Sequence, residues 1–214
     1  MHYLNKAIFV KRSEITPMIY LIHPDIKSYK SFVINSEEAR SKLGQETMFH
    51  FDPRPKPYSD IWQPLEIEFD SLSSAKKVVM PDITTRNGRL FLNQHAYDAL
   101  HTVLDAHGEF LPITHKDGDG YLFNVLEDAN TNGALDTKLS TCDEYGDVQS
   151  VVFHEDKLKG ASVVRTAFDN YQGVYCSDRF KILVEGTGLS GVIFSADLGT
   201  IYPPDATAGS PAKH

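Results

Sequence analysis

The chain of 214 residues contains two cysteines, one tryptophan and no apolar run as long as a membrane span. Cys142 and Cys176 have neither the spacing of metal ligands nor that of a redox pair, which excludes a cysteine-based motif and favours a reducing compartment. The apolar run that follows Met1 is too short for a signal peptide. These absences predict a cytoplasmic protein without a membrane partner.

Basic side chains are also scarce. The chain has 21 Lys and Arg residues against 29 Asp and Glu residues, and its formal net charge is -8. This balance excludes a dedicated nucleic-acid-binding protein, which needs a basic surface to replace the counterions of the phosphates. An acidic surface instead suits a basic protein partner.

Short apolar runs, separated by Gly, Asp, Asn and Pro, are the main structural signal. Leu65, Ile67 and Phe69 alternate with glutamates, which is the period of a strand with one buried face and one acidic face open to solvent or a partner. A helix is expected to begin at Ser36, which two glutamates follow. We predict an α+β fold with a mixed, mainly antiparallel sheet. Further strands are expected at residues 18–22, 31–34, 90–92, 109–113, 121–126, 148–153 and 162–168.

Two segments, 90–113 and 174–194, share the plan of strand, short helix and strand. In the first, Asn93 is a helix cap and Gly108 is expected to stop the helix in a left-handed conformation. In the second, Ser177 is the cap. Phe180, Leu183 and Val184 share one helical face, Gly186 ends the helix, and Gly188 and Gly191 permit a tight return into the next strand. An internal duplication would explain the shared plan.

Proline alternates with other residues from Asp52 to Pro57, which favours an extended connector. We place a boundary there, between a strand-rich N-terminal subdomain, 1–57, and a main domain, 58–201. The alternative is a surface loop within one domain. Residues 202–214 cannot bury apolar surface and are expected to form a flexible tail.

No pattern of catalytic residues is present. The chain has no Gly-x-Ser-x-Gly elbow, and His95, His101 and His107 are six residues apart, so they face different sides of a helix. Gly186, Gly188 and Gly191 follow a helix instead of preceding one, and no lysine follows them, so they are interpreted as structural glycines and not as a phosphate loop. We therefore expect a protein that is not an enzyme and needs no cofactor. A hydrolase with a site assembled from distant His and Asp residues is the alternative.

One segment resembles a calcium loop. Asp128, Asn130 and Asn132 stand at the first ligand positions, and Gly133 follows them. Leu139 occupies the position of the usual bidentate carboxylate, so two oxygen ligands are missing. An Asn- and Gly-rich turn explains the segment, and a calcium-responsive binding module, with Asp136 as a further ligand, is the alternative.

Amphipathic aromatic and acidic side chains are the candidate binding residues of the chain. Tyr58, Trp62 and Tyr97 are of the type enriched at interface hot spots, although Trp62 is better explained as a core residue. A group of acids is expected around one hairpin, where it would steer association with a basic partner unless it is only a solvated face. These acids are Asp117, Asp119, Glu127 and Asp128.

The closing segment, with Ser-Asp-Arg-Phe-Lys at 177–181 and Gly-Leu-Ser-Gly-Val at 188–192, resembles the closing motif of a family of bacterial polymorphic-toxin immunity proteins, the one numbered eleven in the immunity series. Four further segments resemble landmarks of that family in the same order: 62–69, 81–83, 90–100 and 134–140. Asn93 departs from the serine expected there, and nothing before Trp62 matches.

The resemblance implies a protein that binds and neutralises a cognate toxin. Families of this kind often accompany metal-dependent nuclease toxins, so a basic nuclease is the expected partner. Tyr58, Tyr97 and the four acids would then be the toxin-binding residues. The oligomeric state stays open.

Overall fold

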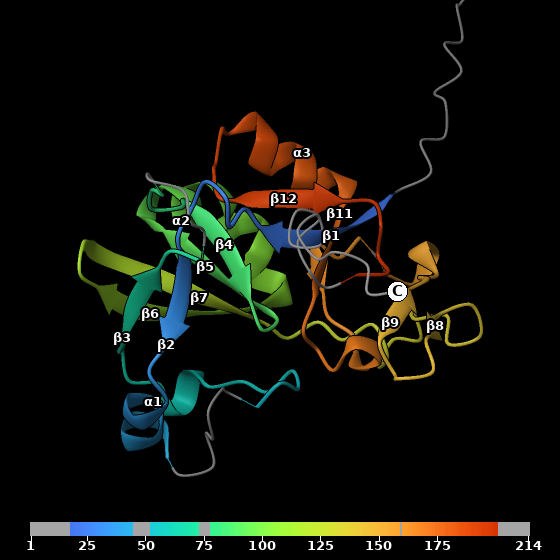
Figure 1. Ribbon diagram of the computed structural model, residues 1–214, viewed down its shortest axis with the longest axis horizontal. Helices are drawn as coiled ribbons and strands as arrows, with labels where there is room; N and C mark the ends of the chain where they lie inside the picture. Colours follow the sequence, from blue (N-terminus) through green and yellow to red (C-terminus); the bar gives the residue numbers. More distant parts are fainter. Residues whose placement is uncertain (1–17, 45–51, 73–77, 159, 201–214) are drawn as a thin grey trace, which may run out of the picture.

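Two main β-sheets organise the chain in a computed structural model that describes residues 18–44, 52–72, 78–158 and 160–200. The flexible tail expected at 202–214 lies outside these residues. Figure 1 shows the larger sheet and the smaller one side by side, with α3 (Asp178–Gly186) on the smaller sheet. Among the described residues, no helix is long and apolar enough to cross a membrane.

The larger sheet has six strands, and all neighbours are antiparallel except β3 and β6, which are parallel. The expected α+β fold with a mixed, mainly antiparallel sheet is thus confirmed. In spatial order the strands are β2 (Ser31–Ile34), β3 (Leu65–Asp70), β6 (Gly108–His115), β7 (Gly118–Val125), β5 (Arg89–Asn93) and β4 (Ile83–Arg86).

The smaller sheet has four strands, in the order β10 (Val163–Val164), β11 (Val174–Ser177), β1 (Ile19–Pro24) and β12 (Val192–Ser195). Because β1 lies in the middle of this sheet and β2 pairs with β3, residues 19–34 belong to the same two sheets as the rest of the chain. The described residues therefore show no separate N-terminal subdomain ending at residue 57.

Shorter elements complete the described chain. A third, two-stranded sheet pairs β8 (Thr141–Cys142) with β9 (Val148–Ser150). The strands expected at 148–153 and 162–168 are shorter than predicted, because the chain leaves each sheet after two or three residues. The 3-10 turns are η1 (Ser59–Ile61), η2 (Asp105–His107), η3 (Glu155–Leu158) and η4 (Ala167–Asp169).

Both predicted strand–helix–strand units have the same topology. In the first, β5 and β6 both pair antiparallel with β7, so that β7 lies between two strands joined by α2 (Gln94–Leu104). In the second, β11 and β12 both pair antiparallel with β1, so that β1 lies between two strands joined by α3. The inserted strand β7 follows the first unit in sequence, whereas the inserted strand β1 precedes the second unit by about 150 residues.

The helix caps form as the sequence predicts, with one exception. The Asn93 side-chain oxygen accepts a hydrogen bond from the Ala96 amide at 2.9 Å, and Ser177 Oγ accepts one from Phe180 at 3.4 Å. Gly108 does not end its helix in a left-handed conformation, because its φ of 174° is extended. Glycine is needed there because a Cβ would collide with the carbonyl oxygen of Asn124 on the paired strand β7.

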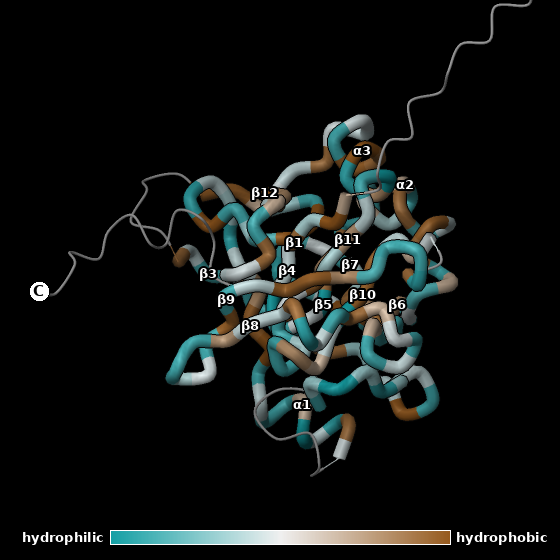
Figure 2. Tube along the Cα trace, turned by 90° about the vertical axis from the view of Figure 1, so that its right-hand side faces the viewer, coloured by the Kyte–Doolittle hydropathy of each residue, from teal (hydrophilic) through white to brown (hydrophobic). Residues whose placement is uncertain are grey.

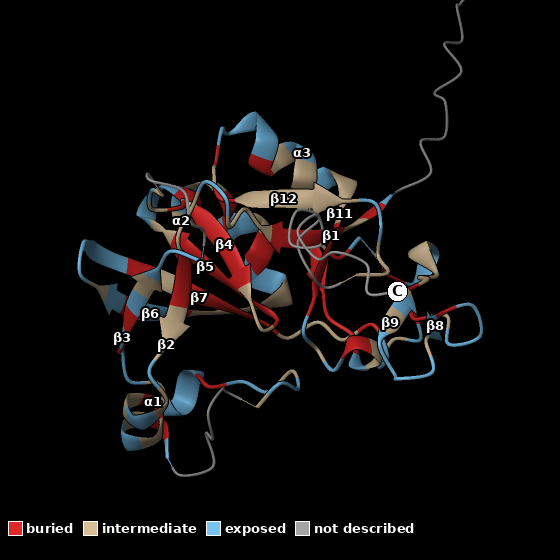
Figure 3. Ribbon diagram, viewed as in Figure 1, coloured by how far each residue is buried: buried red, intermediate tan, exposed pale blue. Residues whose placement is uncertain are grey.

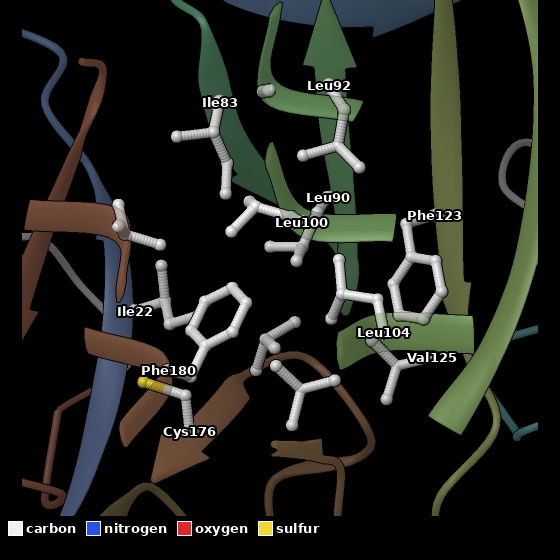
Figure 4. Close-up of a cluster of buried hydrophobic side chains, with 14 of the residues drawn as sticks. Ile22, Ile83, Leu90, Leu92, Leu100, Leu104, Phe123, Val125, Cys176 and Phe180 are labelled. Atoms are coloured by element: carbon white, nitrogen blue, oxygen red, sulfur yellow. The ribbon is translucent and has the colours of Figure 1, made fainter. Parts of the chain in front are cut away.

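The main core lies between the two sheets and includes residues of α2 and α3 (Figure 4). Leu90 and Phe123 of the larger sheet meet Leu100 of α2, while Ile22 and Phe180 come from the smaller sheet and α3. A second core covers the opposite face of the larger sheet and includes α1 (Ser36–Leu43), whose cap is Asn35. A third core lies on the outer face of the smaller sheet. As expected, Cys176 packs in the main core, and its burial raises the pKa of the thiol.

Candidate binding surface

One face of the larger sheet carries a row of polar side chains beyond α2. In the strand register, Glu66 of β3 lies beside Thr114 of β6, and Thr114 lies opposite Asp119 of β7. Paired residues project from the same face of a sheet, and successive residues along a strand alternate between faces. Leu65 and Ile113 are buried in the second core. Glu66, Thr114 and Asp119 are therefore exposed together on the other face.

Aromatic rings extend this row toward α2. Tyr121, two residues after Asp119, stacks on Tyr97 of α2 with ring centroids 4.1 Å apart and an interplanar angle of 19°. His101 stacks on Tyr97 at 5.2 Å, and Phe110 meets it edge-on at 5.0 Å. Both tyrosines are half-buried. Packing thus fixes their rings, while each residue stays partly accessible.

We call Tyr97, Tyr121, Thr114, Asp119 and Glu66 the acidic tyrosine surface. Among the described residues, no basic side chain forms an ion pair with Asp119 or Glu66. The hairpin end that carries Asp119 is exposed, at the left of Figure 3. Fixed aromatic rings thus lie beside carboxylates that form no ion pair among the described residues.

The four predicted acids do not gather at one place. Asp117 and Asp119 lie at the exposed turn of the β6–β7 hairpin, whereas Glu127 and Asp128 follow the other end of β7, roughly 25 Å of extended chain away. Asp128 accepts hydrogen bonds from the Asn130 amide and the Tyr171 hydroxyl. The half-buried Glu127 and Asp128 therefore belong to a structural turn, because β7 is too long for both pairs of acids to share one surface.

Tyr58 is buried rather than accessible, with 2% of its surface exposed. Its amide donates to the Glu109 carboxylate at 2.7 Å, and its hydroxyl accepts from the Asp52 amide at 2.8 Å. Its ring packs in the second core, so Tyr58 cannot contact a partner in this conformation. Trp62 is half-buried against the same core and donates its Nε1–H to the Pro112 carbonyl at 2.8 Å.

Residues 52–58, the proline-rich segment, cover two buried arginines. Arg89 donates to the Asp52 carbonyl at 2.9 Å, and Arg165 donates to the Pro53 carbonyl at 3.0 Å. Burial, with the repulsion of Arg165, lowers the pKa of Arg89 to about 9, and burial lowers that of Arg165 to about 10. Both stay charged at neutral pH. Because Arg89 lies in β5 and Arg165 directly follows β10, the segment that accepts from both joins the larger sheet to the end of β10.

The calcium-loop residues serve the surrounding backbone. Asp128, Asn132 and Asp136 each accept hydrogen bonds from amides two or three residues further along the chain. Asn130 Oδ1 accepts from the Thr166 hydroxyl and the Ala167 amide. The local bonds of Asp128, Asn132 and Asp136 are those of Asx turns, whereas Asn130 links the loop to the chain that follows β10. In the described parts of the chain, no three His, Cys, Asp or Glu side chains form a group that could hold a metal ion.

The histidines also serve separate neighbours. His95 lies 3.7 Å from Asp82, and His107 lies 3.8 Å from Glu127. His101 stacks on Tyr97 and hydrogen-bonds within its own helix. His95 and His101 thus face different neighbours from α2, as expected, whereas His107 lies beyond the end of that helix, in η2.

Sequence reasoning missed two members of the acidic tyrosine surface, Tyr121 and Thr114. The two-residue spacing between Asp119 and Tyr121 could have predicted that Tyr121 shares a face of β7 with Asp119. Its stacking on Tyr97 depends on how α2 crosses the sheet, which the local sequence does not specify. No protein-family model and no curated protein matches this chain.

Proposed function

We propose that this chain is an immunity protein that binds and neutralises a cognate bacterial polymorphic toxin, without catalysis, in the cytoplasm of the cell that makes it. The proposal starts from the resemblance of residues 60 to 195 to such a family. It is supported by the negative charge of the chain and by the acidic tyrosine surface. A bound protein of this size would block the toxin's active site sterically and by its charge.

The stacked pair Tyr97 and Tyr121 is the observation that carries this proposal. Tyrosines whose rings are already held by packing lose little conformational entropy on binding, and they present large apolar area together with a polar group. Tyr97 is fixed by three ring neighbours, Tyr121, His101 and Phe110. This is the preorganisation expected of an interface hot spot.

The carboxylates beside the tyrosines indicate the chemistry of the partner. Asp119 and Glu66 lie on one face of the sheet, and the chain as a whole has a net charge of -8. A basic protein would approach such a surface faster than a neutral one. A nuclease needs a basic surface to hold phosphates. It is therefore the toxin class that the acidic tyrosine surface fits best.

Co-expression tests the function. The gene next to this one should encode a secreted protein with a C-terminal toxin domain, and this chain should restore growth to cells that express that domain. Failure to restore growth while both proteins are soluble would refute the immunity function.

Substitutions test the surface separately, by calorimetry with an inactive toxin domain. Tyr97→Ala is expected to weaken binding by about 2 kcal/mol, which is roughly 30-fold in Kd. Its control is Tyr145→Ala, which removes a tyrosine that is 83% exposed near the β8–β9 hairpin. Asp119→Lys should slow association, whereas Asp156→Lys in η3 should not. A tight complex that is insensitive to Tyr97 and Asp119 would place the interface elsewhere and leave the function intact.

A further inference from the structure

A pocket of about 600 Å³ opens between the β8–β9 hairpin, η4 and the chain that follows β12. It lies at the opposite end of the molecule from the β6–β7 turn (Figure 1), and Figure 2 shows that the turn between β8 and β9 is largely hydrophilic. Its lining includes four aspartates and no basic side chain. These aspartates are Asp143, Asp147, Asp169 and Asp197.

The aspartates at the rim use only part of their hydrogen-bonding capacity. Oδ1 of Asp143 accepts from the amides of Tyr145 and Asp147, both at 2.9 Å, and Oδ1 of Asp197 accepts from the Gly199 amide at 2.8 Å. Among the described residues, no hydrogen bond reaches the Oδ2 atom of Asp143 or of Asp197. The backbone thus fixes these carboxylates and leaves an acceptor on each.

Asp169 is a different case, because it is 97% buried and still incompletely bonded. Its Oδ2 accepts from the Gly173 amide at 2.8 Å and from the Tyr175 hydroxyl at 3.0 Å. Its Oδ1 has no hydrogen-bond partner within the described chain, although Arg165 is near enough to interact electrostatically. Burial raises the pKa of this carboxyl to about 6. The amides of Asp169 and Tyr171 also stabilise the charged form of this carboxyl, and Oδ1 keeps the capacity to accept a further donor.

The spread of the carboxylates argues for an organic cation rather than a metal ion. A metal ion needs several ligands within about 2.5 Å, and the described residues contain no such group. Carboxylates distributed around a larger pocket instead suit a cation with separated N–H donors. The half-buried ring of Phe168 and the side chain of Gln149 also line the pocket. They supply an apolar wall and a further polar group.

We propose that this pocket binds an extended organic cation, an alkylammonium or alkylguanidinium group, which donates to Asp143, Asp197 and the buried Asp169. The same chemistry has two sources, a free polyamine or the side chain of a basic residue in a protein. The pocket shares no residue with the acidic tyrosine surface. Its ligand is therefore independent of the toxin contacts proposed above.

Calorimetry with the full chain at low ionic strength tests the proposal, with spermidine and Nα-acetyl-arginine amide as the two probes. At least one probe should bind with a millimolar Kd or better. Stronger binding of spermidine would indicate a free polyamine, and stronger binding of the arginine amide would indicate a protein side chain.

The test variant is Asp143→Asn with Asp197→Asn, because asparagine keeps the Oδ1 acceptor of each turn. It should weaken binding about tenfold, since two charge-assisted hydrogen bonds are lost at partly exposed positions. The control is Glu144→Gln with Asp156→Asn, which removes the same charge from exposed positions outside the lining and should leave binding unchanged.

Amide chemical shifts in the unmodified protein locate the site without any variant. The Gln149 and Asn170 signals should move on titration. Binding of neither probe, equal affinity in the test and control variants, or shifts confined to other parts of the chain would each overturn the proposal.

Discussion

Replacement of Glu109 with alanine should loosen the attachment of η1 and of the adjoining end of residues 52–58 to the larger sheet. The Glu109 carboxylate accepts three hydrogen bonds, from the Tyr58 amide at 2.7 Å, the Ser59 amide at 3.0 Å and the Asn124 side chain at 2.7 Å. Asn124 is fully buried, and its Nδ2 also donates to the Lys56 carbonyl. Glu109 therefore holds η1 directly, and it also accepts from the Asn124 side chain that bonds the covering segment.

The expected loss of stability follows from these three bonds. A hydrogen bond to a charged group contributes about 1.5–3 kcal/mol, and less where solvent replaces the lost partner. The Ser59 donor is at the surface, whereas Tyr58 and Asn124 are buried residues. Together they give ~4 kcal/mol for Glu109→Ala, which lowers Tm by roughly 10 °C in a chain of this length.

Urea unfolding, followed by the fluorescence of Trp62, measures the free energy of unfolding. Hydrogen exchange measures the protection of the Tyr58 and Ser59 amides, which should fall in Glu109→Ala. The control is Glu68→Ala, an exposed glutamate of β3, which should change stability by less than about 0.5 kcal/mol. A loss below about 1 kcal/mol for Glu109→Ala, with both amides still protected, would refute the anchoring role.

Three further outcomes follow from buried positions. The pKa of Asp169 is raised from 3.8 to about 6, so the folded state binds the proton more tightly than the unfolded state. The protein should therefore lose up to ~3 kcal/mol of stability as the pH rises from about 4 to about 6. Urea unfolding at pH 4 and 7 should show that Asp169→Asn removes this loss. Gly88→Ala should cost about 3 kcal/mol by thermal unfolding, because φ is +71° and a Cβ would collide with the Tyr171 carbonyl. Leu100→Ala should cost about 2–5 kcal/mol in the same assay, because it leaves a cavity in the main core.

Local sequence patterns were sufficient for most of the elements and for the Asn93 and Ser177 caps. The alternation at 65–69 predicted which face of β3 is buried, because side chains alternate in any strand regardless of its neighbours. Asn93 and Ser177 were identified as caps because the bond from a side chain to an amide three residues on is formed within the same segment. Gly108 was misjudged because its constraint comes from Asn124 on another strand.

The candidate surface was predicted only in part. Tyr97 and Asp119 were each predicted as binding residues and lie on the same side of the larger sheet, whereas Tyr58, also predicted as a binding residue, is buried. The sequence alone does not indicate which aromatic residue fills the core, because Tyr58 and Tyr97 both have polar neighbours in sequence. Glu127 and Asp128 were grouped with the hairpin because they are near it in sequence, while the extended form of β7 separates them in space.

By itself, the sequence determined the α+β class, the two strand–helix–strand units and the acidic face of β3, because each depends on residues within a few positions of one another. Only the tertiary structure decided that β1 and β7 lie inside these units, that Tyr97 stacks on Tyr121, and that Asp143, Asp169 and Asp197 line one pocket. Those contacts join segments separated by about 20 to 150 residues. They are selected by the packing of whole sheets, whose energy is shared among many side chains and leaves no local pattern to read.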